Sequence, residues 1–135
     1  MTFKFLPDVA FEAESPTVGG LFESCALAVT DIMVDPATLE ARVGREITFQ
    51  GKDLDRLLYD FLTELIIAKD VDSLLFKEFS VHVDQKEGSL RVTAKGEPID
   101  RGRHALRNDV KAVTMHLFGV KRRGKRWTAT VVLDI

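Results

Sequence analysis

The sequence predicts an α+β fold, a mostly antiparallel sheet with two principal helices packed on one face. Two segments, residues 18–32 and 54–66, carry apolar residues at the 3.6-residue spacing of a helix. Several other segments alternate apolar and polar residues at the two-residue spacing of a strand, and short turns separate them. With 135 residues, no internal repeat and no linker, the chain is expected to form a single domain over residues 1–135.

An N-terminal strand is predicted to precede the first helix. Residues 3–13 keep an odd-numbered apolar row that only Pro7 interrupts, which predicts one strand with an irregularity at the proline. Thr17 is then a suitable N-cap, because its hydroxyl can accept from a free amide of the first helical turn. The helix is predicted to bury an apolar stripe formed by Val18, Leu21, Cys25, Ala28, Val29 and Ile32.

The second helix has the clearest pattern of the chain. A strand is predicted before it over residues 42–50, and Asp53 follows as the N-cap of the helix. The helical stripe consists of Leu54, Leu57, Leu58, Phe61, Leu62, Leu65 and Ile66.

Two hairpins are predicted in the second half of the chain. Residues 79–83 and 90–94 alternate in polarity on either side of the turn sequence QKEG. Residues 96–104, GEPIDRGRH, are expected to form a connecting loop. Residues 110–120 and 127–135 are expected to pair around KRRGKR, with Gly124 at the centre of the turn.

Charge is distributed unevenly along the chain, although the net charge is only −2. Residues 1–40 contain one Lys and seven Asp or Glu, whereas residues 101–126 contain nine Lys or Arg and one Asp. Such polarity is typical of a surface that faces a charged partner. A single cysteine, no apolar run of membrane-spanning length and no signal-peptide pattern together favour a cytoplasmic location.

Residue types suited to catalysis do not form a recognisable constellation. Cys25 lies on the apolar stripe of the first predicted helix, where a buried structural thiol is expected rather than a nucleophile. His82, His104 and His116 are spread over three segments without the spacing of a zinc site. No glycine-rich phosphate loop, GxSxG or HExxH motif occurs. The sequence therefore does not predict an enzyme.

The KRRGKR turn places five cations around one glycine. They are Lys121, Arg122, Arg123, Lys125 and Arg126. One interpretation is a solvated hairpin tip, and the other is an electrostatic contact with RNA or with an acidic protein. No exposed aromatic residues alternate with these cations, so the sequence does not predict a stacking platform for single strands.

Asp134 is a candidate metal ligand. It lies on the opposite face of the predicted last strand from Trp127, and Asp8 lies opposite the odd-numbered apolar row of the first strand. If the two strands are neighbours, these carboxylates meet near one end of the sheet, and the α-carboxylate of Ile135 is a third donor. Three hard oxygen donors without His or Cys suit Ca²⁺ or Mg²⁺ rather than zinc. The alternative is that these residues are ordinary surface acids.

Five segments, taken in order, resemble the archease family. They are FKFLPDVAFEA (3–13), TVGGLFESCALAVTDIMVD (17–35), DLDRLLYDFLTELI (53–66), DVKAVTMHLFGV (109–120) and VVLDI (131–135). The resemblance spans essentially the whole chain, and the VKAVT stretch and the terminal Asp-Ile are its most specific parts. It implies an archease-like two-layer sandwich and an accessory protein rather than an enzyme.

The resemblance also implies a partner and a cofactor. Archeases assist the RtcB-type tRNA-splicing ligase, which joins RNA ends bearing a 2′,3′-cyclic phosphate or 3′-phosphate to 5′-hydroxyl ends. They promote guanylylation of the ligase and its multiple turnover, and they can broaden its nucleotide use. The expected partner is therefore the ligase, and contact with RNA is expected only through it. The metal-binding acids of the family correspond to Asp8, Asp134 and the carboxylate of Ile135. Ca²⁺ is the expected cation, with Mg²⁺ or Mn²⁺ as alternatives.

The resemblance also assigns further residues of this chain to positions of the family. Lys111 corresponds to the functional lysine of the VKA motif, Asp109 stands where a Glu is usual, and His104 corresponds to the loop histidine. Phe5 and Ala10 stand where many archeases have His and Gly. For Lys111 the alternative is a lysine that protects an edge strand from aggregation. Two further functions stay open: a stand-alone metal-dependent phosphohydrolase and a small RNA-binding module.

Overall fold

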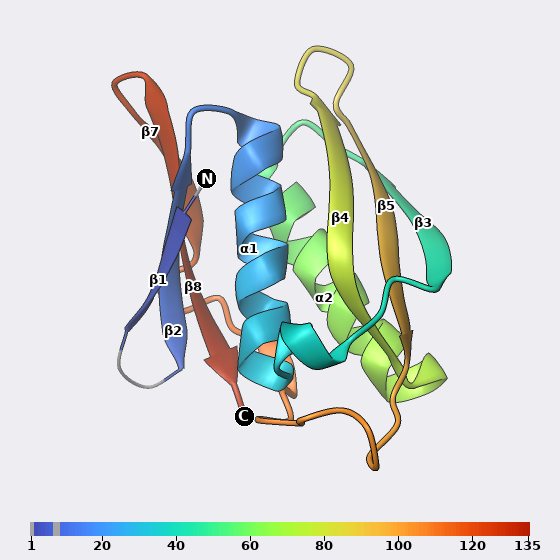
Figure 1. Cartoon of the computed structure of the whole chain (residues 1–135). Helices are drawn as coiled ribbons and strands as arrows, with labels where there is room; N and C mark the ends of the chain where they lie inside the picture. Colours follow the sequence, from blue (N-terminus) through green and yellow to red (C-terminus); the bar gives the residue numbers. More distant parts are fainter. Residues whose placement is uncertain (1, 7–8) are drawn as a thin grey trace.

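The computed structural model describes residues 2–6 and 9–135 (Figure 1). Its helices are α1 (Val18–Met33) and α2 (Leu54–Asp72), with a short 3-10 helix, η1 (Pro36–Thr38). Its strands are β1 (Thr2–Leu6), β2 (Ala10–Ser15), β3 (Val43–Gln50), β4 (Leu74–Asp84), β5 (Ser89–Pro98), β6 (Ala112–Val113), β7 (Gly119–Arg123) and β8 (Arg126–Asp134).

The strands form two antiparallel sheets, so the α+β class is confirmed while the expected single sheet is divided in two. β1, β2, β8, β6 and β7 form a five-stranded sheet, and β3, β5 and β4 form a three-stranded one. Each helix contacts strands of both sheets, and Figure 1 shows α1 between β8 and β4. The helices therefore fill the space between the sheets instead of covering one face of a single sheet.

The N-terminal segment is a hairpin, which corrects the prediction of one irregular strand. β1 pairs antiparallel with β2, so that Phe3 lies opposite Ala13 and Phe5 opposite Phe11. Val9 has a φ of 56°, a left-handed conformation that is uncommon for a β-branched residue. Pro7, where the irregularity was predicted, lies outside the described residues.

Strand β8 is the centre of the five-stranded sheet. One edge of β8 pairs with β2, so the condition that the first and last segments are neighbours is met, and Phe11 lies opposite Val131. The other edge pairs with β7 along its first half and with β6 at its end. The predicted strand over residues 110–120 is therefore divided into two short strands, and both join β8.

The two helices supply much of the core. Both predicted N-caps are confirmed, because the side chain of Thr17 accepts from Gly20 and that of Asp53 accepts from the amides after it. Phe22 and Phe61 are fully buried and stack with ring centroids 6.5 Å apart. Truncating a buried Phe to Ala typically costs about 3–5 kcal/mol. In the described part of the chain, neither helix combines the length and the apolar character needed to cross a membrane.

Cys25 is fully buried on α1, as its place on the apolar stripe predicted. Burial raises the pKa of its thiol well above the ordinary value, because the thiolate would lose its hydration. The thiol therefore stays protonated and unreactive at neutral pH.

Gly96 permits a close approach between β4 and β5. The register of the two strands shifts between Phe76 and Glu78, and a β-carbon at Gly96 would lie 1.8 Å from the carbonyl oxygen of Leu75. β5 continues through Gly96 to Pro98. The predicted loop over residues 96–104 thus begins with the last three residues of a strand.

Candidate functional site

One end of the five-stranded sheet brings together three segments that are distant in the sequence. The main-chain N–H of Lys111 donates to the carbonyl oxygen of Asp134 at 2.7 Å, and that of Leu133 donates to Val9 at 3.0 Å. In the β6–β8 register, Ala112 lies opposite Asp134. The VKA motif and the start of β2 therefore flank the last residues of the chain, where Figure 1 marks the C-terminus.

Asp134 and Ile135 present oxygen atoms at this end of the sheet. Asp134 is exposed and Ile135 is 45% exposed, so a cation or a partner protein can reach both. Their donors, a side-chain and a main-chain carboxylate, are hard oxygen atoms that suit Ca²⁺ or Mg²⁺. Asp8 lies outside the described residues, so its place beside Asp134 stays a prediction. Within residues 2–6 and 9–135, no three side chains of His, Cys, Asp and Glu gather as a metal site.

Asp109 fixes the VKA segment to helix α2. The Nζ atom of Lys69, whose side chain is 8% exposed, lies 2.5 Å from the carboxylates of both Asp109 and Asp70. Burial lowers the pKa of Lys69, but the hydrogen bonds to the two carboxylates outweigh burial and raise it. In turn the hydrogen bond from Lys69 lowers the pKa of Asp109, with a smaller contribution from the charge of Lys111.

Glu97, near the end of β5, organises the loop that leads to this motif. Its carboxylate is fully buried, and the guanidinium of Arg103 binds its two oxygens at 2.5 and 3.1 Å. The amide of Glu40 donates to it at 2.6 Å, and Arg42 lies 3.4 Å away. The hydrogen bonds from Arg103 hold the pKa of Glu97 well below its usual range, and burial, which acts in the opposite direction, does not cancel them.

His104 belongs to the same buried cluster. Its Nδ1 accepts from the amide of Asp100 at 2.9 Å, which places the proton of the neutral ring on Nε2. That Nε2 lies 3.1 Å from the carboxylate of Glu97. The described contacts of His104 therefore hold the loop in place, and its role in activating a ligase stays a prediction.

The loop is also joined to the C-terminal end of α1. The amide of Arg107 donates to Met33 at 2.8 Å, and Asn108 donates to Ile32 from both its main chain and its side chain. These donors satisfy carbonyl groups that have no partner within the helix. Val110 is fully buried just before Lys111. The segment from Glu97 to Val110 is thus held at several points, and Lys111 follows directly from it.

The basic hairpin is a separate surface. The turn between β7 and β8 contains Gly124 with a φ of 61°, as the predicted hairpin requires. Arg126 pairs with Glu14 at 3.2 Å, and the guanidinium of Arg122 lies 5.5 Å from the centre of the Trp127 ring. β8 has nine residues, so at 3.4 Å per residue the hairpin lies about 27 Å from the C-terminal end of that strand.

Two residues that organise the site were not predicted from the sequence. Lys69 stands at a helical spacing from Leu62 and Leu65. This position, on the continuation of the apolar stripe, is the sequence signal from which a buried cation could have been predicted. Glu97 carried no such signal, because it lies beside Gly96 where β5 departs from simple alternation. Its burial depends on Arg103 and His104, which come from the loop that folds back over it.

These features define a class of protein: a small, two-sheet α+β domain whose C-terminal residues and a lysine-bearing segment form an exposed, charged end. The sequence matches the Archease protein family (MTH1598/TM1083) over residues 3–135. The chain therefore belongs to the archease family.

Curated relatives are similar over almost their whole length. The chain is 36% identical to the protein archease of Pyrococcus furiosus over 136 residues, which cover 98% of this chain and 96% of the relative. It is 36% identical over 135 residues, with the same coverage, to the protein archease of Methanothermobacter thermautotrophicus.

Solved structures share the fold. The solution structure of Methanobacterium thermoautotrophicum protein 1598 superposes with a TM-score of 0.82 at 34% identity, covering 99% of this chain and 97% of that one. The crystal structure of a Thermotoga maritima archease, described as a possible chaperone, gives a TM-score of 0.69 at 17% identity and covers 95% and 91% of the two chains. At that identity the second likeness shows the fold alone.

Proposed function

We propose that this protein is an accessory protein that acts in the cytoplasm on an RtcB-type tRNA-splicing ligase. It promotes guanylylation of the ligase and its repeated turnover in joining RNA ends. Membership of the archease family supports this proposal. The observation that carries it is the hydrogen bond between Lys111 and Asp134, because it joins the two most specific motifs of the resemblance at one exposed end of the sheet.

In this proposal Asp8, Asp134 and the α-carboxylate of Ile135 hold a divalent cation, with Ca²⁺ expected and Mg²⁺ or Mn²⁺ as alternatives. The donor chemistry supports a hard cation. When bound, such a cation supplies positive charge near a phosphate that is being transferred. The residues of this chain bind and orient it, and the exposed Asp134 and Ile135 face solvent where a ligase can dock.

Lys111 has a distinct role in the proposal. Its ammonium presents one compact positive charge beside the acidic terminus. Charges that are fixed before the reaction stabilise the charge that develops during phosphoryl transfer. The contacts of Asp109 with Lys69, and those of the loop with α1, hold the main chain of Lys111 in place.

A guanylylation assay tests the proposal. Purified ligase is incubated with labelled GTP, a divalent cation and this protein, and covalent guanylate on the ligase is measured over time. We expect clear stimulation by the wild-type protein and its loss with Asp8→Asn or Asp134→Asn. Glu46→Gln is the matched control, since Glu46 is an exposed acid on β3 with no ion pair among the described residues.

Other outcomes distinguish the alternatives. Equal stimulation by Asp134→Asn and Glu46→Gln would remove Asp134 from the site. No stimulation by wild-type protein, together with hydrolysis of a model phosphate ester in the absence of ligase, would favour a stand-alone phosphohydrolase. No effect in either assay would contradict the accessory function itself.

A further inference from the structure

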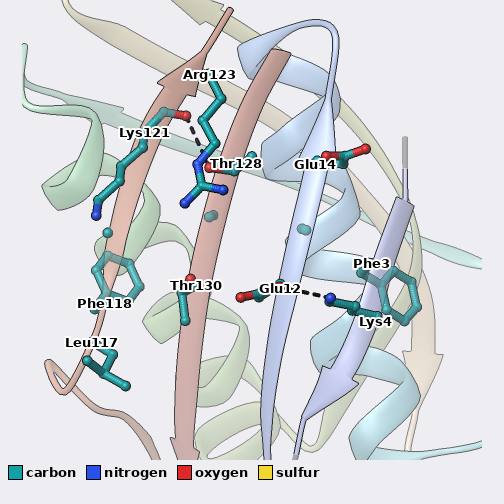
Figure 2. Close-up of a pocket in the computed structure, with 13 residues that line it drawn as sticks. Phe3, Lys4, Glu12, Glu14, Leu117, Phe118, Lys121, Arg123, Thr128 and Thr130 are labelled. Carbon is teal, nitrogen blue, oxygen red and sulfur yellow. Dashed lines mark hydrogen bonds and ion pairs between the residues drawn. The ribbon is translucent and has the colours of Figure 1, made fainter.

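The outer face of the five-stranded sheet carries an open trough of about 700 Å³. Both helices lie on the other side of this sheet, and no element of the described part of the chain covers the trough. Figure 2 shows its lining residues on four adjacent strands, β1, β2, β8 and β7.

The side chains of the trough are sorted by charge across the sheet. In the strand register, Thr128 of β8 lies between Glu14 of β2 on one side and Lys121 of β7 on the other. Glu12 occupies the next position on the same face, opposite Thr130. One wall therefore carries carboxylates, the floor carries hydroxyl groups, and the other wall carries cations (Figure 2).

The two walls differ in their internal pairing. The carboxylates are already neutralised, Glu12 by Lys4 at 3.3 Å and Glu14 by Arg126 at 3.2 Å. Lys121 and Arg123 have no ion-pair partner within residues 2–6 and 9–135. The trough as a whole therefore carries a net positive charge, which is concentrated on β7.

Apolar groups complete the rim. Leu117 is 69% exposed with a φ of 55°, and with Phe118 it forms one end of the β7 wall. Phe3 stands at the β1 margin (Figure 2). The trough thus offers free cations, hydroxyl donors and acceptors, carboxylate acceptors and a few apolar surfaces.

We propose that this trough binds single-stranded RNA. Lys121 and Arg123 are two residues apart on one face of β7, about 6.8 Å along the strand, a spacing that lets them contact successive phosphates. The threonine hydroxyls and the carboxylates of β2 can then accept from 2′-hydroxyl groups and base amines across the floor. An acidic peptide would satisfy the cation wall, but its carboxylate side chains have no donors for the threonine hydroxyls and the carboxylates of β2. The 2′-hydroxyl groups and base amines of RNA supply such donors, so the lining favours RNA.

This site differs from the one in the proposed function and does not depend on it. The trough lies on the face of the sheet that carries the basic hairpin, and the Lys111–Asp134 junction lies at the other end of β8. The test accordingly uses the whole protein without ligase, so that failure of one proposal leaves the other standing.

Fluorescence anisotropy with a labelled, unstructured RNA 12-mer measures the binding. We expect weak, salt-sensitive binding by the wild-type protein, which the double variant Lys121→Ala/Arg123→Ala weakens at least about tenfold at low salt. Removing two phosphate contacts should also reduce the slope of log K against log salt by about 1.4. Thr130→Val keeps the side-chain shape and removes one hydroxyl, so it should weaken binding by about threefold and leave the slope unchanged.

A matched control removes the same two residue types elsewhere. Arg91 and Lys95 are exposed on β5, in the other sheet, and have no ion pair among the described residues. The affinity of Arg91→Ala/Lys95→Ala for RNA should lie within about twofold of the wild-type affinity, a difference that reflects only the general effect of net charge. Equal losses in the two double variants would overturn the proposal, because binding would then be only non-specific attraction.

Two competitor measurements complete the test. A DNA 12-mer of the same sequence should bind more weakly than the RNA, since it lacks the 2′-hydroxyl groups. A poly-glutamate peptide should compete poorly. Absence of RNA binding at low salt, or tighter binding of the peptide than of RNA, would contradict the proposal.

Discussion

Lys111 and Asp134 are joined through their main chains, by a hydrogen bond of 2.7 Å from the amide of Lys111 to the carbonyl oxygen of Asp134. The side chains of both residues are exposed and take no part in this bond. A side-chain substitution at either position therefore leaves the junction intact. The structural and chemical roles of these two residues can be separated by experiment.

Lys111→Ala should have a free energy of unfolding within about 0.5 kcal/mol of the wild-type value, because an exposed side chain is removed and the main-chain hydrogen bond remains. Stimulation of ligase guanylylation should nevertheless fall strongly, since the compact ammonium is lost. Lys111→Arg should restore only part of it, because a planar guanidinium replaces a point charge. Full stimulation by both variants would assign Lys111 to protection of the sheet edge instead.

The C-terminal carboxylate gives a second prediction. Adding a short Gly-Ser extension after Ile135 converts this carboxylate into a neutral amide carbonyl. Since hard cations are held by the number and charge of their carboxylates, calorimetric titration should show affinity for Ca²⁺ or Mn²⁺ reduced about tenfold or more. The melting temperature should not change, and the same extension at the N-terminus should preserve more of the affinity. Equal affinities would exclude Ile135 as a ligand.

Glu97 should determine part of the acid sensitivity of the protein. Its pKa is lower in the folded than in the unfolded state, so its stabilising contribution is complete above its ordinary pKa of 4.5 and is lost progressively as the pH falls below that value. Glu97→Gln should therefore lower the melting temperature clearly at pH 7, because the substitution removes the ionised carboxylate that Arg103 binds. The difference in melting temperature between Glu97→Gln and the wild-type protein should become smaller towards pH 3. Melting curves from pH 3 to 8 measure this, and a constant difference would contradict the linkage.

Gly96 and Gly44 form a matched pair for testing the β4–β5 contact. Gly96→Ala should destabilise the protein by about 1–3 kcal/mol or more, because its β-carbon would collide with the main chain of Leu75. Gly44→Ala, on β3, meets no atom within 4 Å and should be neutral within about 0.5 kcal/mol. Chemical denaturation of both variants provides the measurement. Similar stabilities would show that the strands can separate at Gly96 without cost.

Local patterns predicted both helices, their caps and the turn of the basic hairpin, because these features depend on residues close together in sequence. The caps at Thr17 and Asp53 and the turn at Gly124 all follow from the chemistry of single residues and their neighbours. The division into two sheets did not follow. Alternation shows which face of a strand is buried, but both sheets bury one face against the same helices, so their strands have the same pattern.

The candidate site was predictable only in part for a similar reason. The alternation along β8 placed Asp134 on the face opposite Trp127, and the observed burial along that strand agrees. By contrast, the contacts of Glu97 and Lys69 join residues far apart in the chain. Glu97 bonds to the amide of Glu40 and Lys69 to Asp109, and no local signal pairs such positions.

The pairing of β2 with β8 has a consequence for how the molecule folds. β4 and β5 are neighbours along the chain and need close only a short turn, whereas Phe11 and Val131 come from opposite ends of the chain. Contacts of such large sequence separation form slowly, because the entropy of closing the intervening loop opposes them until much of the structure is present. We expect the three-stranded sheet to form early and β8 to enter last. The junction of Lys111 with Asp134 would then appear only in the final step of folding, and partly folded molecules would lack the site altogether.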